Sequence, residues 1–206
     1  AQGFGLNNFE KIFNDEMVQA VDYSSFLYHL QGDYDEEDKN NEIRIKKNVS
    51  LKKWKNAMRQ MPDITGQRVY IGTDLSNKID LCSHGFEFPD LNFVMQHSFL
   101  PEDILWEKIK KDKVPYDLWI KQGYITKIDG AVIDDDVVIE WLVDFCKDYE
   151  LSVQEVCFDP WSARQYAIAM EKDKGFTMVE IRQGMKTLSE PTKNFREKIY
   201  KNELHH

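Results

Sequence analysis

The chain has 206 residues, which is enough for one full domain with an extension or for two small domains. Its 36 acidic and 27 basic side chains leave a formal charge of −9, which argues against a protein that grips nucleic acid through a broadly basic face. Neither a membrane-spanning stretch nor a secretory signal is present, and the three cysteines are widely spaced without a CxxC pair, so we expect a cytoplasmic protein with reduced thiols and no membrane partner.

Residues 1–65 are predicted to form a connecting segment that is mainly helical. Residues 1–32 carry apolar side chains at helical spacing. A polar stretch follows, and its acidic run at residues 33–38 is expected to lie in a loop. A further helix is predicted over residues 51–61, where Pro62 ends it.

The main domain is predicted to cover residues 66–206 and to open with three strands in an antiparallel meander, over residues 69–75, 81–88 and 93–99. The elements expected after the meander are helices over 101–109 and 116–122, a hairpin of strands 124–128 and 131–133 around Asp129-Gly130, a helix over 137–149, a strand over 153–158, a helix over 162–170, a strand over 177–181 and a helix over 191–200. Asp134 to Asp136 precede the helix over 137–149, where they are expected to cap the helix and to complement its dipole. A meander followed by alternating helices and strands predicts an α/β fold, a mixed sheet with helices on both faces, which is the layout of a ribonuclease H-like domain.

Two of the predicted strands end in an aspartate. Asp74 closes the first apolar run, Asp159 closes the run over residues 153–158, and Asp80 lies in the turn after the first strand. If the two strands run side by side, a tight hairpin at residues 76–79 brings all three carboxylates to one edge of the sheet. Hard cations such as Mg²⁺ and Mn²⁺ prefer oxygen ligands, and two such ions can activate a water and stabilise the leaving 3′-oxygen. These acids therefore predict metal-dependent phosphodiester hydrolysis.

Two of the three acids also have a simpler explanation. Asp159 precedes Pro160 and is explained equally well as a cap of the following helix, whereas Asp80 can be an ordinary turn residue. Asp74 is harder to explain in this way, because an unpaired carboxylate inside an otherwise buried strand is costly.

Other candidate groups are less informative. The histidines lack metal-ligand spacing, and alternation along the strand leaves open whether His84 faces the acids. Lys193 and Arg196 lie on a helix face that is either solvated or in contact with phosphates. The tryptophans predicted to anchor the core, with DNA stacking as the alternative for one of them, are Trp106, Trp119, Trp141 and Trp161.

Several short motifs occur in an order that resembles the nuclease domain of tailed-bacteriophage terminase large subunits, over about residues 66–206. The motifs are Tyr70-Ile71-Gly72-Thr73-Asp74-Leu75-Ser76 with Ile79-Asp80-Leu81, Phe99-Leu100-Pro101, Val114-Pro115-Tyr116 with Trp119, Gly123-Tyr124-Ile125, Phe158-Asp159-Pro160-Trp161 with Gln165, Gln183-Gly184, and Leu188-Ser189-Glu190-Pro191 with Lys193.

This resemblance implies a ribonuclease H-like endonuclease that cuts concatemeric viral double-stranded DNA with two divalent metals, Mg²⁺ or Mn²⁺, during genome packaging in a bacterial host. It implies Asp74, Asp159 and Asp80 as metal ligands, and the portal and the small terminase subunit as partners. The family's motor needs a phosphate-binding loop, and no GxxxxGK[ST] occurs here, so we expect no ATP site and no motor domain.

The family's last acidic ligand comes from a segment beyond the helix that ends near Leu204, so we expect a domain truncated at its C-terminus. The sequence does not distinguish whether His205-His206 is native or part of a tag. Two alternatives stay open. One is a catalytically impaired docking module for other packaging proteins, and the other is a different ribonuclease H-like nuclease such as a transposase or a resolvase.

Overall fold

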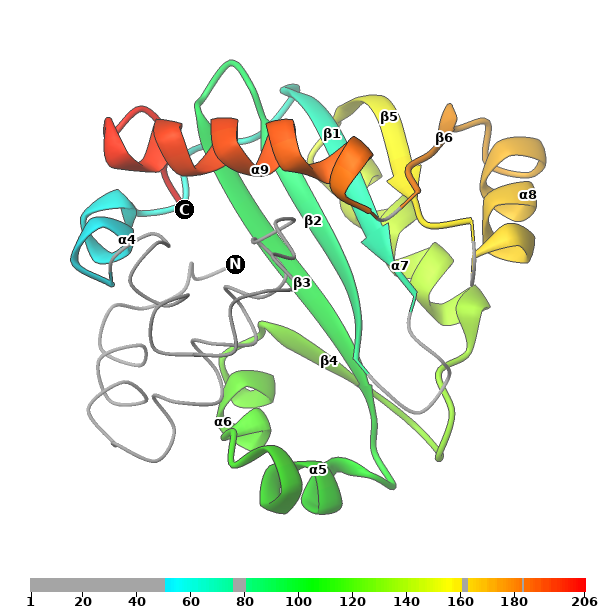
Figure 1. The fold of residues 1–206 in the computed structure, drawn as a ribbon. Coiled ribbons are helices and arrows are strands. Elements are labelled where there is room, and N and C mark those ends of the chain that lie inside the picture. The colour runs from blue at the N-terminus through cyan, green and yellow to red at the C-terminus, as the bar shows by residue number, and fades with distance from the viewer. Residues whose placement is uncertain (1–50, 76–80, 161–162, 183) are drawn as a thin grey trace.

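The computed structural model describes residues 51–75, 81–160, 163–182 and 184–206 of the chain. These residues form a six-stranded sheet of order β4-β3-β2-β1-β5-β6 (Figure 1). The strands are β1 (Arg68–Asp74), β2 (Cys82–Phe88), β3 (Phe93–Pro101), β4 (Ile125–Ile128), β5 (Ser152–Phe158) and β6 (Met178–Glu180). The first three strands pair antiparallel, whereas β4, β5 and β6 pair parallel to β3, β1 and β5 respectively. The predicted α/β fold, a ribonuclease H-like mixed sheet, is confirmed.

The two faces of the sheet differ, because buried and exposed residues alternate along β1. Val69, Ile71 and Thr73 are buried, whereas Gly72 and Asp74 between and after them are exposed. The buried face packs against α7 (Asp135–Asp148) and α8 (Arg164–Lys172), whose apolar side chains join the same core cluster. This face holds the main hydrophobic core.

The other face of the sheet is crossed by α9 (Met185–Tyr200), which Figure 1 shows running over β3, β2 and β1. An ion pair of 3.7 Å joins Lys198 on this helix to Glu87 on β2. Between β3 and β4 in the chain, α5 (Leu105–Asp112) and α6 (Tyr116–Lys121) form a second, smaller apolar cluster. Helices therefore lie on both faces, and the exposed end of β1 remains between them.

The last residues of the chain are part of the fold. His205 forms a parallel bridge to Phe93, at the start of β3. His206 stacks on Trp54 of α4 (Leu51–Ala57) with ring centroids 3.8 Å apart, and its Nε2 lies 3.1 Å from the Trp54 carbonyl oxygen. Trp54 and Ala57 also pack with side chains of α9 and with Leu204. Residues 51–57 thus pack on the main domain, and the expected boundary near residue 65 stays a prediction.

Three elements differ from the sequence-based expectation. No strand forms over residues 131–133, because Gly130 turns at φ +93° and the chain leads directly into α7 while β4 pairs with β3. The helix expected over 101–109 begins at Leu105, since Pro101 still belongs to β3. The closing helix begins at Met185, so that Pro191 lies inside it. In contrast, the predicted cap of α7 is confirmed, because Asp134 accepts a hydrogen bond from the Asp136 amide.

The tryptophans predicted as core anchors divide into two groups. Trp141 stacks on His97 in the main core and Trp119 packs on the second cluster. Trp106 is 64% exposed, so the prediction was wrong for this residue: it lies one position after the buried Leu105, on the outer side of an amphipathic helix. Trp161 lies outside the described residues. No helix among the described residues is long and apolar enough to cross a membrane.

Candidate metal centre at the sheet edge

The parallel pairing of β1 and β5 brings two aspartates to the same edge of the sheet, which is the edge formed by the C-terminal ends of these strands. Thr73 and Phe158 are register partners, and each is followed directly by an aspartate, Asp74 or Asp159. Neighbouring strands run about 4.8 Å apart, which is close enough for two carboxylates to share one cation. Asp74 is exposed and Asp159 is partly buried. The expectation that β5 runs beside β1 is thus confirmed, while the role of the carboxylates stays a prediction.

The third predicted ligand, Asp80, and the expected hairpin at residues 76–79 lie outside the described residues. Within the described part of the chain, no three acidic, histidine or cysteine side chains gather closely enough to hold a metal ion. Sequence reasoning did not single out Glu180, which ends β6 and is the register partner of Phe158 at the same edge. The only sequence signal was that this acid follows the apolar pair Met178-Val179 within the strand predicted over residues 177–181.

The face of the sheet that carries Asp74 has a glycine pair and two hydroxyl groups beside this acid. Gly72 and Gly85 are paired between β1 and β2, and a Cβ added to Gly72 would meet no atom of a described residue within 4 Å. The Oγ atoms of Ser83 and Ser98 are 2.8 Å apart. Next to the first carboxylate, the Cβ position of Gly72 is therefore free of contacts with the described residues, and the Ser83 hydroxyl beside it is only partly buried.

On the opposite face, directly behind Asp74, lies a group of buried polar side chains. The Thr73 hydroxyl is 3.0 Å from His84 Nδ1 and 3.4 Å from the Tyr166 hydroxyl. His84 is fully buried among Phe99, Trp141 and other aromatic rings, so it faces the core and not the acids. Burial lowers the pKa of His84 to about 3, because the imidazolium ion cannot be solvated there, and a backbone interaction with the Val138 carbonyl opposes this shift only in part.

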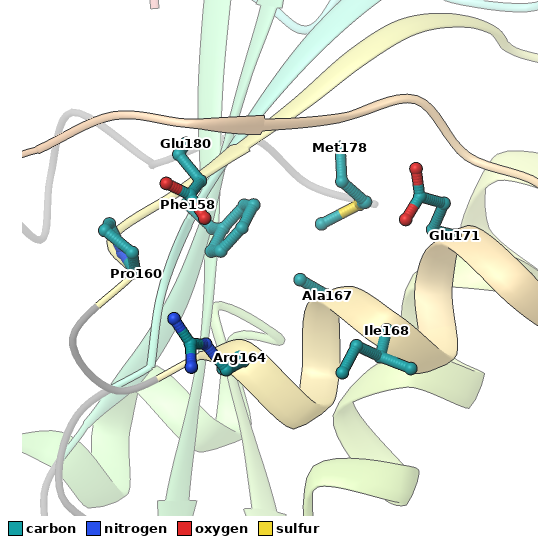
Figure 2. Close-up of a pocket in the computed structure, with 8 residues that line it drawn as sticks. All are labelled: Phe158, Pro160, Arg164, Ala167, Ile168, Glu171, Met178 and Glu180. Carbon is teal, nitrogen blue, oxygen red and sulfur yellow. The ribbon is translucent and has the colours of Figure 1, made fainter.

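A cavity of about 190 Å³ lies between β5, β6 and α8 (Figure 2). Phe158, Ala167 and Met178 form apolar walls, and the charged groups at its rim are Arg164, Glu171 and Glu180. Neither Asp74 nor Asp159 lines it, but the cavity borders the carboxylate edge, because Phe158 and Pro160 on either side of Asp159 both line it.

The lysine and arginine on α9 that sequence reasoning considered are engaged within the protein. Lys193 forms an ion pair with Glu190 one turn earlier on the same helix, at 3.6 Å, and Arg196 is partly buried. All three cysteines are free thiols. Cys82 and Cys146 are buried, as expected of reduced core thiols, whereas Cys157 is only partly buried.

The sequence and the fold of the chain are both similar to those of one protein family. The family model for the terminase large subunit, endonuclease domain, matches residues 39–206. Among curated proteins, the large terminase subunit of Enterobacteria phage HK97 is 28% identical over 137 residues, which cover 63% of this chain and 26% of that protein. The crystal structure of the HK97 bacteriophage large terminase is similar with a TM-score of 0.66 at 26% identity, and the match covers 77% of this chain and 33% of that one.

The chain thus spans between about a quarter and a third of the relatives that it matches. The match to the family model extends over most of the chain and includes every described strand of the sheet. The sequence motifs, the strand order and the comparisons agree. The chain belongs to the family of terminase large-subunit endonuclease domains.

Proposed function

We propose that this chain is a divalent-metal-dependent endonuclease domain that cuts concatemeric viral double-stranded DNA during genome packaging. The observation that carries the proposal is the register of β1 and β5, because it sets Asp74 beside Asp159 at one exposed edge. A helix cap explains Asp159 alone, but it gives no reason for a second acid at the end of the neighbouring strand.

The donor set at this edge fits hard divalent cations. Asp74 and Asp159 supply carboxylate oxygens, which Mg²⁺ and Mn²⁺ prefer, and Asp80 is the expected third ligand. Bound cations of this kind supply an activated water and stabilise the charge that develops on the leaving 3′-oxygen. The role of the chain is to hold the carboxylates at fixed strand ends, where their mutual repulsion favours cation binding.

The open surface next to Asp74 supports a nucleic-acid substrate. Glycine within a strand often marks a place where another backbone approaches closely. Gly72 and Gly85 are not required by the backbone, since neither has a positive φ, and no atom of the residues that the structure describes lies within 4 Å of the Gly72 Cβ position. We propose that the sugar-phosphate backbone of the cut strand passes over this glycine pair to reach the carboxylates.

The outer face of α5 is the proposed contact for the rest of the duplex. Trp106 and Lys110 are four residues apart, so they share one side of the helix, and Lys113 is the C-cap residue directly after its end, with φ 56°. All three are exposed, and neither lysine forms an ion pair with another described residue. Because α5 follows β3, it stands at the same edge of the sheet as Asp74.

The packaging context comes from the family. We propose residues 1–65 as the connecting segment, residues 66–206 as the nuclease, and the portal and the small terminase subunit as partners within the host cytoplasm. The family model and the HK97 relative are both terminases, which favours a packaging nuclease over a transposase or a resolvase.

The proposal is tested by incubating supercoiled plasmid with the purified protein in Mn²⁺, Mg²⁺ or EDTA. Open-circle and linear products are expected with either metal, and none with EDTA or with Asp74→Asn. Asp173→Asn is the matched control, because this exposed acid follows α8 towards the opposite edge of the sheet. Plasmid that stays intact in both metals would contradict the nuclease proposal and favour a docking module.

A further inference from the structure

The strand that carries Asp74 has one exception to its apolar buried face, and this exception lies immediately before the acid. Val69 and Ile71 fill the core from β1, but the next buried position is Thr73, which is only 6% exposed. A buried hydroxyl is costly unless it is hydrogen-bonded. Thr73 meets this requirement through two partners, His84 on β2 and Tyr166 on α8, at 3.0 and 3.4 Å.

The chemistry of these partners requires a hydroxyl at position 73. A neutral imidazole has one donor and one acceptor nitrogen, and the tyrosine hydroxyl can also donate or accept. The threonine hydroxyl can donate one hydrogen bond and accept another, so it satisfies both neighbours whichever His84 tautomer is present. Valine has the same shape but leaves His84 Nδ1 and the Tyr166 hydroxyl without this partner in the core.

The three side chains connect the structural elements from which both acids project. Thr73 precedes Asp74 and is the register partner of Phe158, which precedes Asp159. Tyr166 belongs to α8, the helix that follows Asp159. The two hydrogen bonds therefore join the end of β1 to β2 on one side and to the helix after β5 on the other.

We propose that Thr73 is a positioning residue, whose bonds to His84 and Tyr166 fix the separation of Asp74 and Asp159 for cation binding. This inference rests on the proposed function, because it concerns the same pair of acids. Two carboxylates at neighbouring strand ends repel each other before a cation arrives, and a rigid support keeps them from moving apart.

The sheet contains a matched control for this arrangement. On the same buried face, His97 Nε2 lies 2.8 Å from the Thr126 hydroxyl, which joins β3 to β4. The chemistry is the same histidine-threonine contact, but it lies on the other side of β2 from β1 and β5. Thr126→Val thus removes a comparable hydrogen bond and leaves both hydrogen bonds of Thr73, to His84 and to Tyr166, unchanged.

The test is a calorimetric titration of the DNA-free protein with Mn²⁺, with thermal unfolding of each variant measured in parallel. Thr73→Val is expected to weaken Mn²⁺ binding about tenfold, as the loss of groups that orient metal ligands does elsewhere. Thr73→Ser retains the hydroxyl and is expected to bind Mn²⁺ like the unmodified protein. Thr126→Val is expected to lose thermal stability but to keep its Mn²⁺ affinity.

Tyr166→Phe gives a second measurement if Thr73→Val does not fold, because it removes a single hydroxyl and keeps the aromatic ring. It is expected to weaken Mn²⁺ binding about two- to threefold, less than Thr73→Val because His84 keeps its partner. If Tyr166→Phe binds Mn²⁺ as tightly as the unmodified protein, the hydrogen bond between Thr73 and Tyr166 of α8 does not position the acids.

The outcomes separate this inference from the proposed function. If Asp74→Asn abolishes Mn²⁺ binding while Thr73→Val binds Mn²⁺ normally, Thr73 is a structural residue and the inference is overturned. The inference is also overturned if Thr126→Val weakens Mn²⁺ binding as much as Thr73→Val does. If Asp74→Asn binds Mn²⁺ as tightly as the unmodified protein, the proposed metal centre itself is wrong.

Discussion

Thr73 of β1 and Phe158 of β5 are paired in register between two parallel strands, and an aspartate follows each of them. This relationship turns two distant acids, Asp74 and Asp159, into neighbours at one edge of the sheet. A cation bound between them adds stability to the folded state, because the unfolded chain holds the two acids far apart.

Mn²⁺ is therefore expected to raise the unfolding temperature of the protein. At a concentration about 100 times the dissociation constant the gain is about 2.7 kcal/mol, which corresponds to about 5–10 °C for a chain of this length. Differential scanning fluorimetry with and without Mn²⁺ measures the shift. Asp74→Asn and Asp159→Asn should lose it and Asp173→Asn should keep it, and an equal shift in all three variants would place the cation elsewhere.

The glycine pair beside Asp74 predicts a size-dependent loss of cleavage. Gly72→Ala, Gly72→Val and Gly72→Leu are expected to fold, because the Cβ position is open and the backbone conformation suits any residue. Stability should even rise by about 0.5–1 kcal/mol on replacing glycine with alanine in a strand. Cleavage should decline as the side chain grows, with KM rising before kcat falls. Full activity of the leucine variant would show that the substrate does not pass over this position.

The outer face of α5 predicts a change in the salt dependence of DNA binding. Lys110→Glu with Lys113→Glu should weaken binding of a linear duplex and lower the slope of log K against log salt by up to about 2, one unit for each lost phosphate contact. Fluorescence anisotropy at several salt concentrations, with Ca²⁺ in place of the catalytic metal, measures this slope.

The matched control for this change is Lys172→Glu with Lys174→Glu. These exposed lysines lie at the end of α8, which runs back from the acidic edge. The change in net charge is the same in both double variants. If both weaken DNA binding equally, the effect comes from the charge of the whole protein and not from a contact at α5.

Buried histidines predict that the protein loses stability in mild acid. Burial lowers the pKa of His97 and of His206 from 6.5 to about 4. Below pH 6.5 the unfolded chain binds protons that the folded chain does not bind until about pH 4, so the free energy of unfolding falls as the pH decreases through this window. Each such histidine contributes up to about 1.4 kcal/mol per pH unit.

His206→Phe isolates one of these contributions, because phenylalanine keeps the stacking on Trp54 but does not titrate. Urea unfolding at pH 7, 6 and 5 should give a shallower decline for this variant than for the unmodified protein. Identical slopes would show that His206 titrates normally in the folded state.

Much of the fold follows from local patterns. The apolar run over residues 69–75 predicts β1, and Asp134 predicts the start of α7 through its cap. Pro191 misled the prediction of α9, because proline is typical of a helix start but is tolerated within this helix. Asp129-Gly130 indicated a hairpin, yet its turn leads into a helix, and only tertiary pairing decides between these outcomes.

The candidate site was also predicted only in part, because tertiary pairing decides which residues meet there. Asp74 and Asp159 stand out because each ends an apolar run, and their adjacency was expected from the strand order of a ribonuclease H-like layout. The contacts of Thr73 with His84 and Tyr166 join residues 11 and 93 positions apart, and no local pattern relates them. The exposure of Trp106 depends on which side of α5 faces the second cluster, which the spacing of tryptophans along the chain does not encode.

The central claim is that Asp74 and Asp159 form one metal site, and a double-mutant cycle tests it most directly. The measurement is the single-turnover rate of duplex cleavage in Mn²⁺ for Asp74→Asn, Asp159→Asn and the double variant. Each single substitution is expected to slow cleavage on the order of 10³-fold or more, and the double variant should be no slower than the slower single variant, because groups that act as a unit are lost together. Cleavage by Asp159→Asn at the unmodified rate, or effects that multiply in the double variant, would contradict a shared site.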